Sequence, residues 1–386
     1  MRKQTFIQGA IILAVAGLLA KILGFIPRIL LPRIMGDVGV GLYQMAFPIL
    51  GLMITLTTAG IPIAISKLVS EAIAQNEQKK VRHILMISLF IVGGLSIVFT
   101  PVLFFAAPLI ADVLLTDERA YWPLIAMVPI VPLIGLSAVL RGYFQGKQNM
   151  RPSAIYQVVE SAVRVGSITF CASLLLPYGV EYAACGAMIG VVLGELAGVL
   201  YLIWQFRRVK WSGILAAKKE TQLNHFSILQ SIMRVAIPVT TSRLVGTVSM
   251  VIEPMLVTHS LAIAGFSIAA TTAMYGRYAG MAIPILFFPF FVTYSLYVSL
   301  VPAISEAMAN KNYLNVHHRL NQAIKLSLIT GAPAVVLLFV LAIPITSLLY
   351  DRSEVGTLLQ ILAPFSLFLY LQAPLAAVLQ GMDRAK

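Results

Sequence analysis

Charged side chains recur inside the most apolar stretches of this 386-residue sequence, at depths where an isolated ion is costly and polar function concentrates. Most of these side chains are basic. Lys21 and Arg28 are seven residues apart, which places them two turns apart on one face of a helix. Such a face suits the binding of an anion. The other candidate binding residues at similar depth are Arg141, Arg164, Arg243 and Arg277.

Two glutamates accompany these cations. Glu160 and Arg164 have the i, i+4 spacing of an intrahelical ion pair, and a structural pair is the first expectation for them. Glu253 has no basic residue within one turn, so it must borrow a partner from another helix, take up a proton or bind a cation. We therefore assign Glu160 and Glu253 to ion pairing or ion coupling.

The sequence contains no pattern typical of a catalytic site. Its five His residues lack the spacing of metal ligands, and neither a phosphate-cradling Gly-rich loop nor a nucleophile elbow is found. Cys171 and Cys185 are expected to pack as small hydrophobic residues. We expect no enzymatic activity, no metal and no cofactor. Energy for transport would then come from a monovalent cation gradient or from the membrane potential.

The elements that position these residues are predicted to be membrane-spanning helices. Mean hydropathy is +0.90, and 59% of residues are hydrophobic against 11% charged, which excludes a soluble globular domain. The apolar runs have the length that an α-helix needs to cross a bilayer, and they lack the alternation of barrel strands. Roughly ten spans are predicted, at 6–35, 40–70, 84–111, 120–146, 153–177, 182–206, 232–262, 269–306, 320–349 and 355–381.

The net charge of +13 does not indicate a nucleic-acid partner, because Lys and Arg concentrate in alternate loops. They crowd the N-terminus, the region of Lys79 and Lys80, the region of Lys147, the stretch from Arg207, and the C-terminal end. The positive-inside rule therefore predicts that both ends of this chain are cytoplasmic.

The chain matches itself at an offset of about 235 residues, which predicts an internal duplication. For example, Gly41-Leu42-Tyr43 corresponds to Gly276-Arg277-Tyr278. Six spans per copy make the repeats parallel. We predict an N-terminal lobe of six spans at 1–206, a cytoplasmic connector at 207–230, and a C-terminal lobe at 231–386 with about four spans, an incomplete copy of the first.

Three motifs carry a resemblance to a known family: Lys21-Ile22-Leu23-Gly24-Phe25, Gly60-Ile61-Pro62, and Leu140-Arg141-Gly142-Tyr143-Phe144-Gln145-Gly146. With them the whole chain resembles the polysaccharide-transporter branch of the multidrug/oligosaccharidyl-lipid/polysaccharide (MOP) exporter superfamily. Within that branch it is similar to the stage V sporulation protein B group and to the MurJ lipid II flippases.

The resemblance implies an all-α integral membrane fold with two MATE-like lobes in a V, around a cavity that opens alternately to each membrane face. It implies a polyprenyl-pyrophosphate-linked sugar as cargo, with basic cavity residues meeting the pyrophosphate. On the matching positions, Lys21 stands where the flippases carry a cavity Arg, and Arg28 lies beside the place of a second one.

These observations favour a flippase of the bacterial cell membrane that exports a lipid II-like peptidoglycan or spore cortex precursor. Its partners would be that lipid-linked anionic sugar and membrane lipids. A cation-coupled multidrug antiporter of the same superfamily would need an acidic cavity. A non-transporting scaffold for spore wall synthesis would tolerate the simultaneous neutralisation of Arg28, Arg164 and Arg243. A membrane glycosyltransferase would need paired acids at one membrane face, and the sequence provides none.

Overall fold

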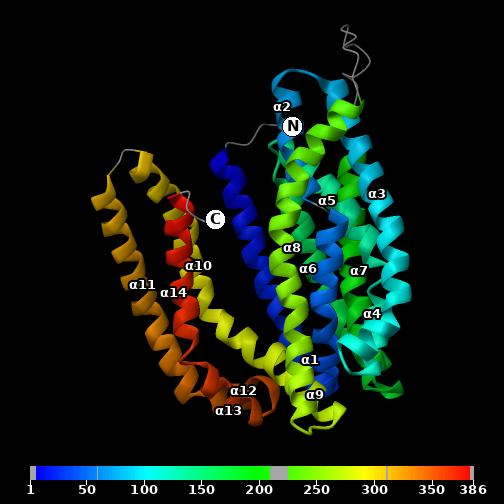
Figure 1. Ribbon diagram of the computed structural model, residues 1–386, viewed down its shortest axis with the longest axis vertical. Helices are drawn as coiled ribbons and strands as arrows, with labels where there is room; N and C mark the ends of the chain where they lie inside the picture. The colour runs from blue at the N-terminus through cyan, green and yellow to red at the C-terminus, as the bar shows by residue number, and fades with distance from the viewer. Residues whose placement is uncertain (1–5, 59, 209–224, 310–311, 383–386) are drawn as a thin grey trace. The chain divides into compact units, whose positions relative to one another are not determined.

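The computed structural model describes residues 6–58, 60–208, 225–309 and 312–382, and every regular element in these residues is helical (Figure 1). The predicted all-α fold is therefore confirmed. The chain forms two compact units, Met1–Tyr275 and Gly276–Lys386. The predicted lobes at 1–206 and 231–386 remain a prediction, and residues 209–224 of the predicted connector lie outside the described residues.

The described residues of the first unit contain nine α-helices and three short segments of other helix types. Its elements are α1 (Phe6–Thr58), α2 (Ile61–Ala74), α3 (Gln78–Leu109), η1 (Ile110–Leu114), η2 (Glu118–Ala120), α4 (Tyr121–Ala126), α5 (Ile130–Gly146), α6 (Arg151–Leu175), η3 (Leu176–Tyr178), α7 (Val180–Arg207), α8 (His225–Ile263) and α9 (Ile268–Tyr275).

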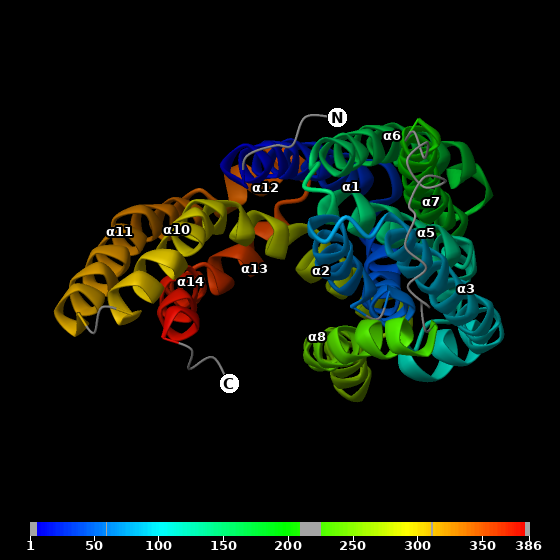
Figure 2. The same cartoon turned by 90° about the horizontal axis from the view of Figure 1, so that it is seen from above.

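In the part of the second unit that the structure describes, a π-helical segment is followed by five α-helices. Its elements are η4 (Gly276–Ala282), α10 (Ile283–Ala309), α11 (Tyr313–Val340), α12 (Ala342–Tyr350), α13 (Glu354–Leu362) and α14 (Ser366–Gly381). Helices α10, α11 and α14 pack side by side (Figure 2). The Tyr350 hydroxyl donates to the carbonyl of Met281, and the Tyr370 hydroxyl donates to the carbonyl of Leu286.

Several predicted spans contain breaks. Helix α1 changes direction at Gly36, whose φ of 66° and ψ of −172° lie outside the helical region and are accessible to glycine. Gly60, with a φ of 65°, precedes α2. The predicted span 120–146 is two helices bent by 40°, and 355–381 is two helices bent by 47°. Pro129 and Pro364 lie at these two bends, where a missing N–H and a fixed φ favour a break.

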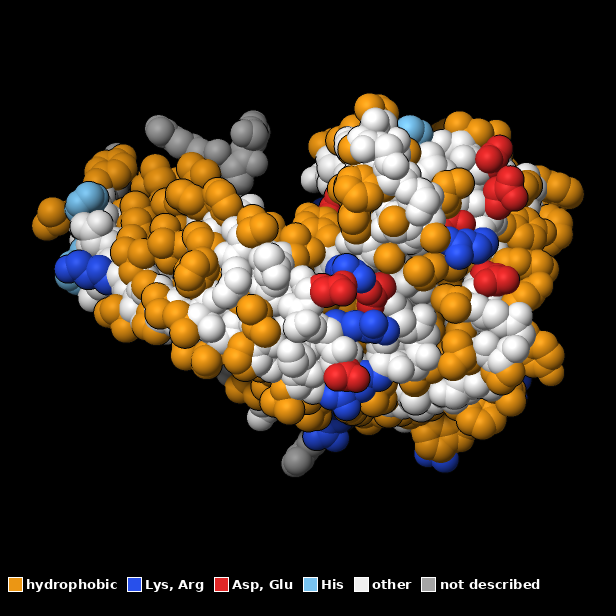
Figure 3. All heavy atoms as spheres, turned by 90° about the horizontal axis from the view of Figure 1, so that it is seen from below, with side chains coloured by type: hydrophobic (Ala, Val, Ile, Leu, Met, Phe, Trp, Pro, Cys, Tyr) orange, Lys and Arg blue, Asp and Glu red, His pale blue; other side chains and the backbone are white. Residues whose placement is uncertain are grey.

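The described residues include six helices that are long and apolar enough to cross a membrane, or up to eight if each bent pair counts as one span. The first of these, Ile11–Ala74, covers two of the predicted spans, one on each side of Gly36. Apolar side chains dominate the face in Figure 3, and the few charged ones gather in small groups. The chain is a multi-pass membrane protein.

Close packing of α6 against α7 gives the first unit a rigid element beside α1 (Figures 1 and 2). Glycine recurs at every fourth position of α7, at Gly186, Gly190, Gly194 and Gly198. A Cβ at Gly190 would lie 2.4 Å from the Cα of Ile168, and one at Gly194 would lie 2.9 Å from the carbonyl oxygen of Glu160. Small residues at this spacing allow two membrane helices to approach backbone to backbone.

Candidate functional site

The predicted cationic face of α1 lies against α6. Lys21 and Arg28 are both exposed, and Gly24 lies between them, one turn from each on the same face. Because Gly24 has no side chain, the guanidinium of Arg164 on α6 reaches this point. Its Nη2 atom lies 3.9 Å from the position that a Cβ of Gly24 would occupy. The structure therefore gathers Lys21, Arg28 and Arg164 along one side of α1.

Tyr43, in the second segment of α1, gives independent support for this grouping. Both Arg164 and Arg28 act electrostatically on its hydroxyl. Tyr43 is 7% exposed, so these two cations approach a buried side chain of the first unit. Arg28 and Arg164 thus belong to one electrostatic environment, although they are far apart in the sequence.

Arg164 also forms the ion pair that its spacing predicts. Its Nη1 lies 2.6 Å from Oε1 of Glu160, and the Arg164 side chain is 31% exposed while that of Glu160 is 12% exposed. The Ser161 hydroxyl donates to the other carboxylate oxygen at 3.2 Å. The acid is therefore the inner member of the pair, and the guanidinium is the outer member.

A second acid lies behind Glu160. Glu195 on α7 is 6% exposed, and the hydroxyl of Tyr156 lies 2.8 Å from both of its carboxylate oxygens. The guanidinium of Arg141 on α5 lies over the Tyr156 ring, 4.9 Å from the ring centroid. Glu195 and Arg141 both lie within electrostatic range of the Glu160 carboxylate.

We call these residues the polar cluster of the first unit: Lys21, Arg28, Arg141, Tyr156, Glu160, Arg164 and Glu195. It contains four basic side chains and two carboxylates, so these residues together carry a net charge of +2 when ionised. The α7 glycines position it, because Gly198 receives the Tyr156 ring and Gly194 receives the backbone of Glu160 and Arg164. An excess of positive charge at a partly exposed, otherwise apolar location can bind an anion.

The remaining predicted site residues lie elsewhere. Arg243 and Glu253 are exposed on α8. Thr247 lies one turn from Arg243, and its hydroxyl oxygen is 3.1 Å from that of Thr55 on α1. Within the described residues, Glu253 forms no ion pair. Arg277 belongs to the second unit, where it forms an ion pair with Glu354.

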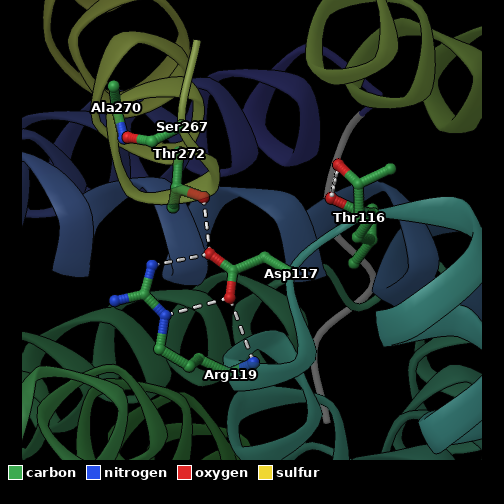
Figure 4. Close-up of polar contacts among 7 residues, drawn as sticks. Thr116, Asp117, Arg119, Ser267, Ala270 and Thr272 are labelled. Carbon is green, nitrogen blue, oxygen red and sulfur yellow. Dashed lines mark hydrogen bonds and ion pairs between the residues drawn. The ribbon is translucent and has the colours of Figure 1, made fainter. Parts of the chain in front are cut away.

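A further polar junction, which sequence reasoning missed, lies where α9 meets the turn before α4 (Figure 4). Asp117 is 2% exposed and pairs with the guanidinium of Arg119 at 2.8 Å. Its carboxylate also accepts a 2.6 Å hydrogen bond from the Thr272 hydroxyl, 155 residues away in the chain. Gly41 allows α9 to approach, since a Cβ there would lie 2.1 Å from the Thr272 carbonyl oxygen. Nothing local in the sequence pairs Asp117 with Thr272.

Metal binding finds no support in the described part of the chain, where no three His, Cys, Asp or Glu side chains come together in a way that could hold an ion.

Together, these observations define an all-α, multi-pass membrane protein with a cation-rich polar cluster in its first unit. The polysaccharide biosynthesis protein family matches residues 6–308, and the MatE family matches residues 278–386. The chain belongs to the polysaccharide biosynthesis protein family.

The comparisons with individual proteins agree. The chain is 46% identical to stage V sporulation protein B of Bacillus subtilis (strain 168), covering 100% of this chain and 74% of that protein. It is 26% identical to the lipid II flippase MurJ of the same organism, covering 98% of this chain and 73% of that protein.

Among solved structures, an inward-facing multidrug resistance MATE family transporter of the MOP superfamily has a TM-score of 0.76 at 16% identity. That match covers 94% of this chain and 81% of the transporter. It supports the predicted MATE-like fold.

Proposed function

We propose that the protein moves a polyprenyl-pyrophosphate-linked sugar, a lipid II-like peptidoglycan or spore cortex precursor, across the cell membrane by alternating access. The observation that carries the proposal is the polar cluster. Lys21, Arg28 and Arg164 line one side of α1, and the cluster has a net charge of +2. A diester pyrophosphate carries two negative charges, so the two are complementary in sign and size.

The same charge balance argues against a multidrug antiporter for cationic drugs, because such a cargo would meet repulsion at this cluster. The relative named as a lipid II flippase supports a lipid-linked cargo, and the relative named for sporulation supports a spore-related role. We place both ends of the chain in the cytoplasm, following the distribution of Lys and Arg. An inside-negative potential of 100 mV would then drive export by about 2.3 kcal/mol per charge.

In the proposed binding mode, Lys21, Arg28, Arg141 and Arg164 attract the pyrophosphate. Arg243 on α8 and Arg277 of the second unit are the two further cations that we assign to the cargo route. Arg164 and Arg28 are the strongest candidates for direct contact, because Arg28 is exposed and the partly exposed Arg164 reaches Gly24 on the same side of α1. A long, planar guanidinium suits a phosphate, to which it can donate two parallel hydrogen bonds.

Complementation tests this function. Cells that lack their own copy would receive the wild-type chain, Arg28→Ala, Arg164→Ala, Arg243→Ala or the exposed control Lys67→Ala, at matched membrane levels. We expect the lipid-linked precursor to accumulate with Arg28→Ala and Arg164→Ala, and normal turnover with Lys67→Ala. Normal precursor turnover in the variants of all three arginines would contradict transport and favour a non-transporting scaffold.

A further inference from the structure

In the Glu160–Arg164 ion pair, a mostly buried carboxylate contacts a partly exposed guanidinium. Arg164 is 31% exposed and extends to Gly24 of α1, between the exposed Lys21 and Arg28, whereas Glu160 is 12% exposed. An anion that arrives along α1 can therefore contact Arg164 but not the carboxylate behind it. The anion and Glu160 compete for one guanidinium.

Glu160 is poorly placed to keep its charge without Arg164. Helix α7 presents the acid Glu195, which repels a carboxylate at Glu160, and α5 presents Arg141, which attracts it. Arg141 is itself shared, since its guanidinium lies over Tyr156, the hydrogen-bond donor to Glu195. From α1, the exposed Lys21 and Arg28 flank Gly24, the point that the Arg164 guanidinium reaches. From α6 itself, Ser161 donates one hydrogen bond.

We infer that Glu160 is a proton-binding site coupled to the cargo anion through Arg164, so that binding of a pyrophosphate at Arg164 is accompanied by uptake of a proton at Glu160. This inference rests on the proposed function and adds the ion that accompanies the cargo. A buried carboxylate that loses its counter-ion beside a second carboxylate is stabilised by protonation.

The step balances in charge and atoms. The guanidinium of Arg164 leaves a Glu160 oxygen and donates to the phosphate oxygens, and one proton from the buffered solution, released by a buffer acid that becomes its conjugate base, forms an O–H bond on the Glu160 carboxyl. No covalent bond to the cargo forms or breaks. Release of the cargo reverses both events. If the site opens to one membrane face for binding and to the other for release, a proton crosses the membrane in the same direction as the anion.

Calorimetry on the purified full chain measures this coupling directly. The probe is geranyl pyrophosphoryl-N-acetylglucosamine, a short diester with no proton that titrates near neutral pH. Titrations at pH 7 in buffers of different ionisation enthalpy give the protons taken up per probe bound. We expect about one proton for the wild type. We expect binding with no uptake for Glu160→Gln, and wild-type uptake for the exposed control Glu71→Gln.

A second variant tests the same inference if Glu160→Gln does not fold. Glu195→Gln removes the like charge behind Glu160, so proton uptake should fall at pH 7 and its midpoint should move to lower pH. Wild-type binding without proton uptake, or equal uptake by Glu160→Gln, would overturn the inference and leave the proposed function standing. Failure of the wild type to bind the probe would overturn both.

Discussion

Two ion pairs in this protein share one spacing but differ in their surroundings. Glu160–Arg164 on α6 and Lys67–Glu71 on α2 are both i, i+4 pairs. The first has a separation of 2.6 Å and is mostly hidden against α7 and α1, while the second has a separation of 4.0 Å with side chains 60% and 51% exposed. Spacing makes a pair possible, but neighbouring helices decide whether that pair can have a function.

The largest effect is expected when the packing of α7 that buries the Glu160–Arg164 pair is removed. In Gly194→Val, the new Cβ would lie 2.6 Å from the Cβ of Arg164 and 2.9 Å from the backbone of Glu160. We expect a loss of roughly 3 kcal/mol or more in the free energy of unfolding, since backbone cannot move aside cheaply.

Thermal unfolding of the purified protein in detergent measures that loss. Gly166→Ala on α6 is the matched control, because a Cβ there meets nothing within 4 Å. Equal melting temperatures for the two variants would contradict the role of the α7 glycines.

Removal of the outer partner of the buried pair should have the next largest effect. Arg164→Ala leaves the Glu160 carboxylate without its 2.6 Å partner. We expect a loss of roughly 2 kcal/mol, less than for a fully buried pair because Arg164 is partly exposed. Chemical denaturation followed by intrinsic fluorescence provides the value. The double variant Glu160→Gln/Arg164→Ala should recover part of the loss, and a purely additive double variant would show that the pair is not coupled.

The hydrogen bond behind the pair should contribute less. Tyr156→Phe removes the hydroxyl that lies 2.8 Å from both Glu195 oxygens while keeping the ring beneath Arg141. We expect a loss of about 1.5 kcal/mol, typical of a hydrogen bond to a charged group. The same denaturation experiment measures it. Tyr201→Phe is the control, because its hydroxyl accepts a hydrogen bond from the neutral Gln205 side chain on the same helix. A loss as large in that control would contradict the assignment.

The exposed pair gives the smallest expected change. Lys67→Ala should alter the free energy of unfolding by less than about 0.5 kcal/mol, because solvent screens an exposed pair and its partner stays hydrated. Melting curves at low and high salt would detect any contribution. A loss that matches Arg164→Ala would remove the distinction between the two pairs.

Local spacing predicts part of the site and none of its long-range contacts. The i, i+4 relation of Glu160 and Arg164 and the shared face of Lys21 and Arg28 follow from helix geometry alone. The meeting of Arg164 with Gly24 depends on how α1 packs against α6, which no local pattern fixes.

The α7 glycines were a usable signal, because four glycines at intervals of four predict close helix contact. In the fold, apolar run length predicts the helices but not the bends, since a proline near the middle of a span is compatible with either a kink or a break. At Pro129 and Pro364, tertiary packing therefore decides between a kink and a break, which the sequence pattern does not.

We propose that the cations along α1 and α6 bind the pyrophosphate of the cargo. The most direct test is the affinity of the purified chain for geranyl pyrophosphoryl-N-acetylglucosamine, compared between wild type, the double variant Arg28→Ala/Arg164→Ala and Lys67→Ala. We predict at least about a tenfold weaker Kd for the double variant, or 1.4 kcal/mol, and no change for Lys67→Ala. Equal affinity in all three proteins would contradict the claim.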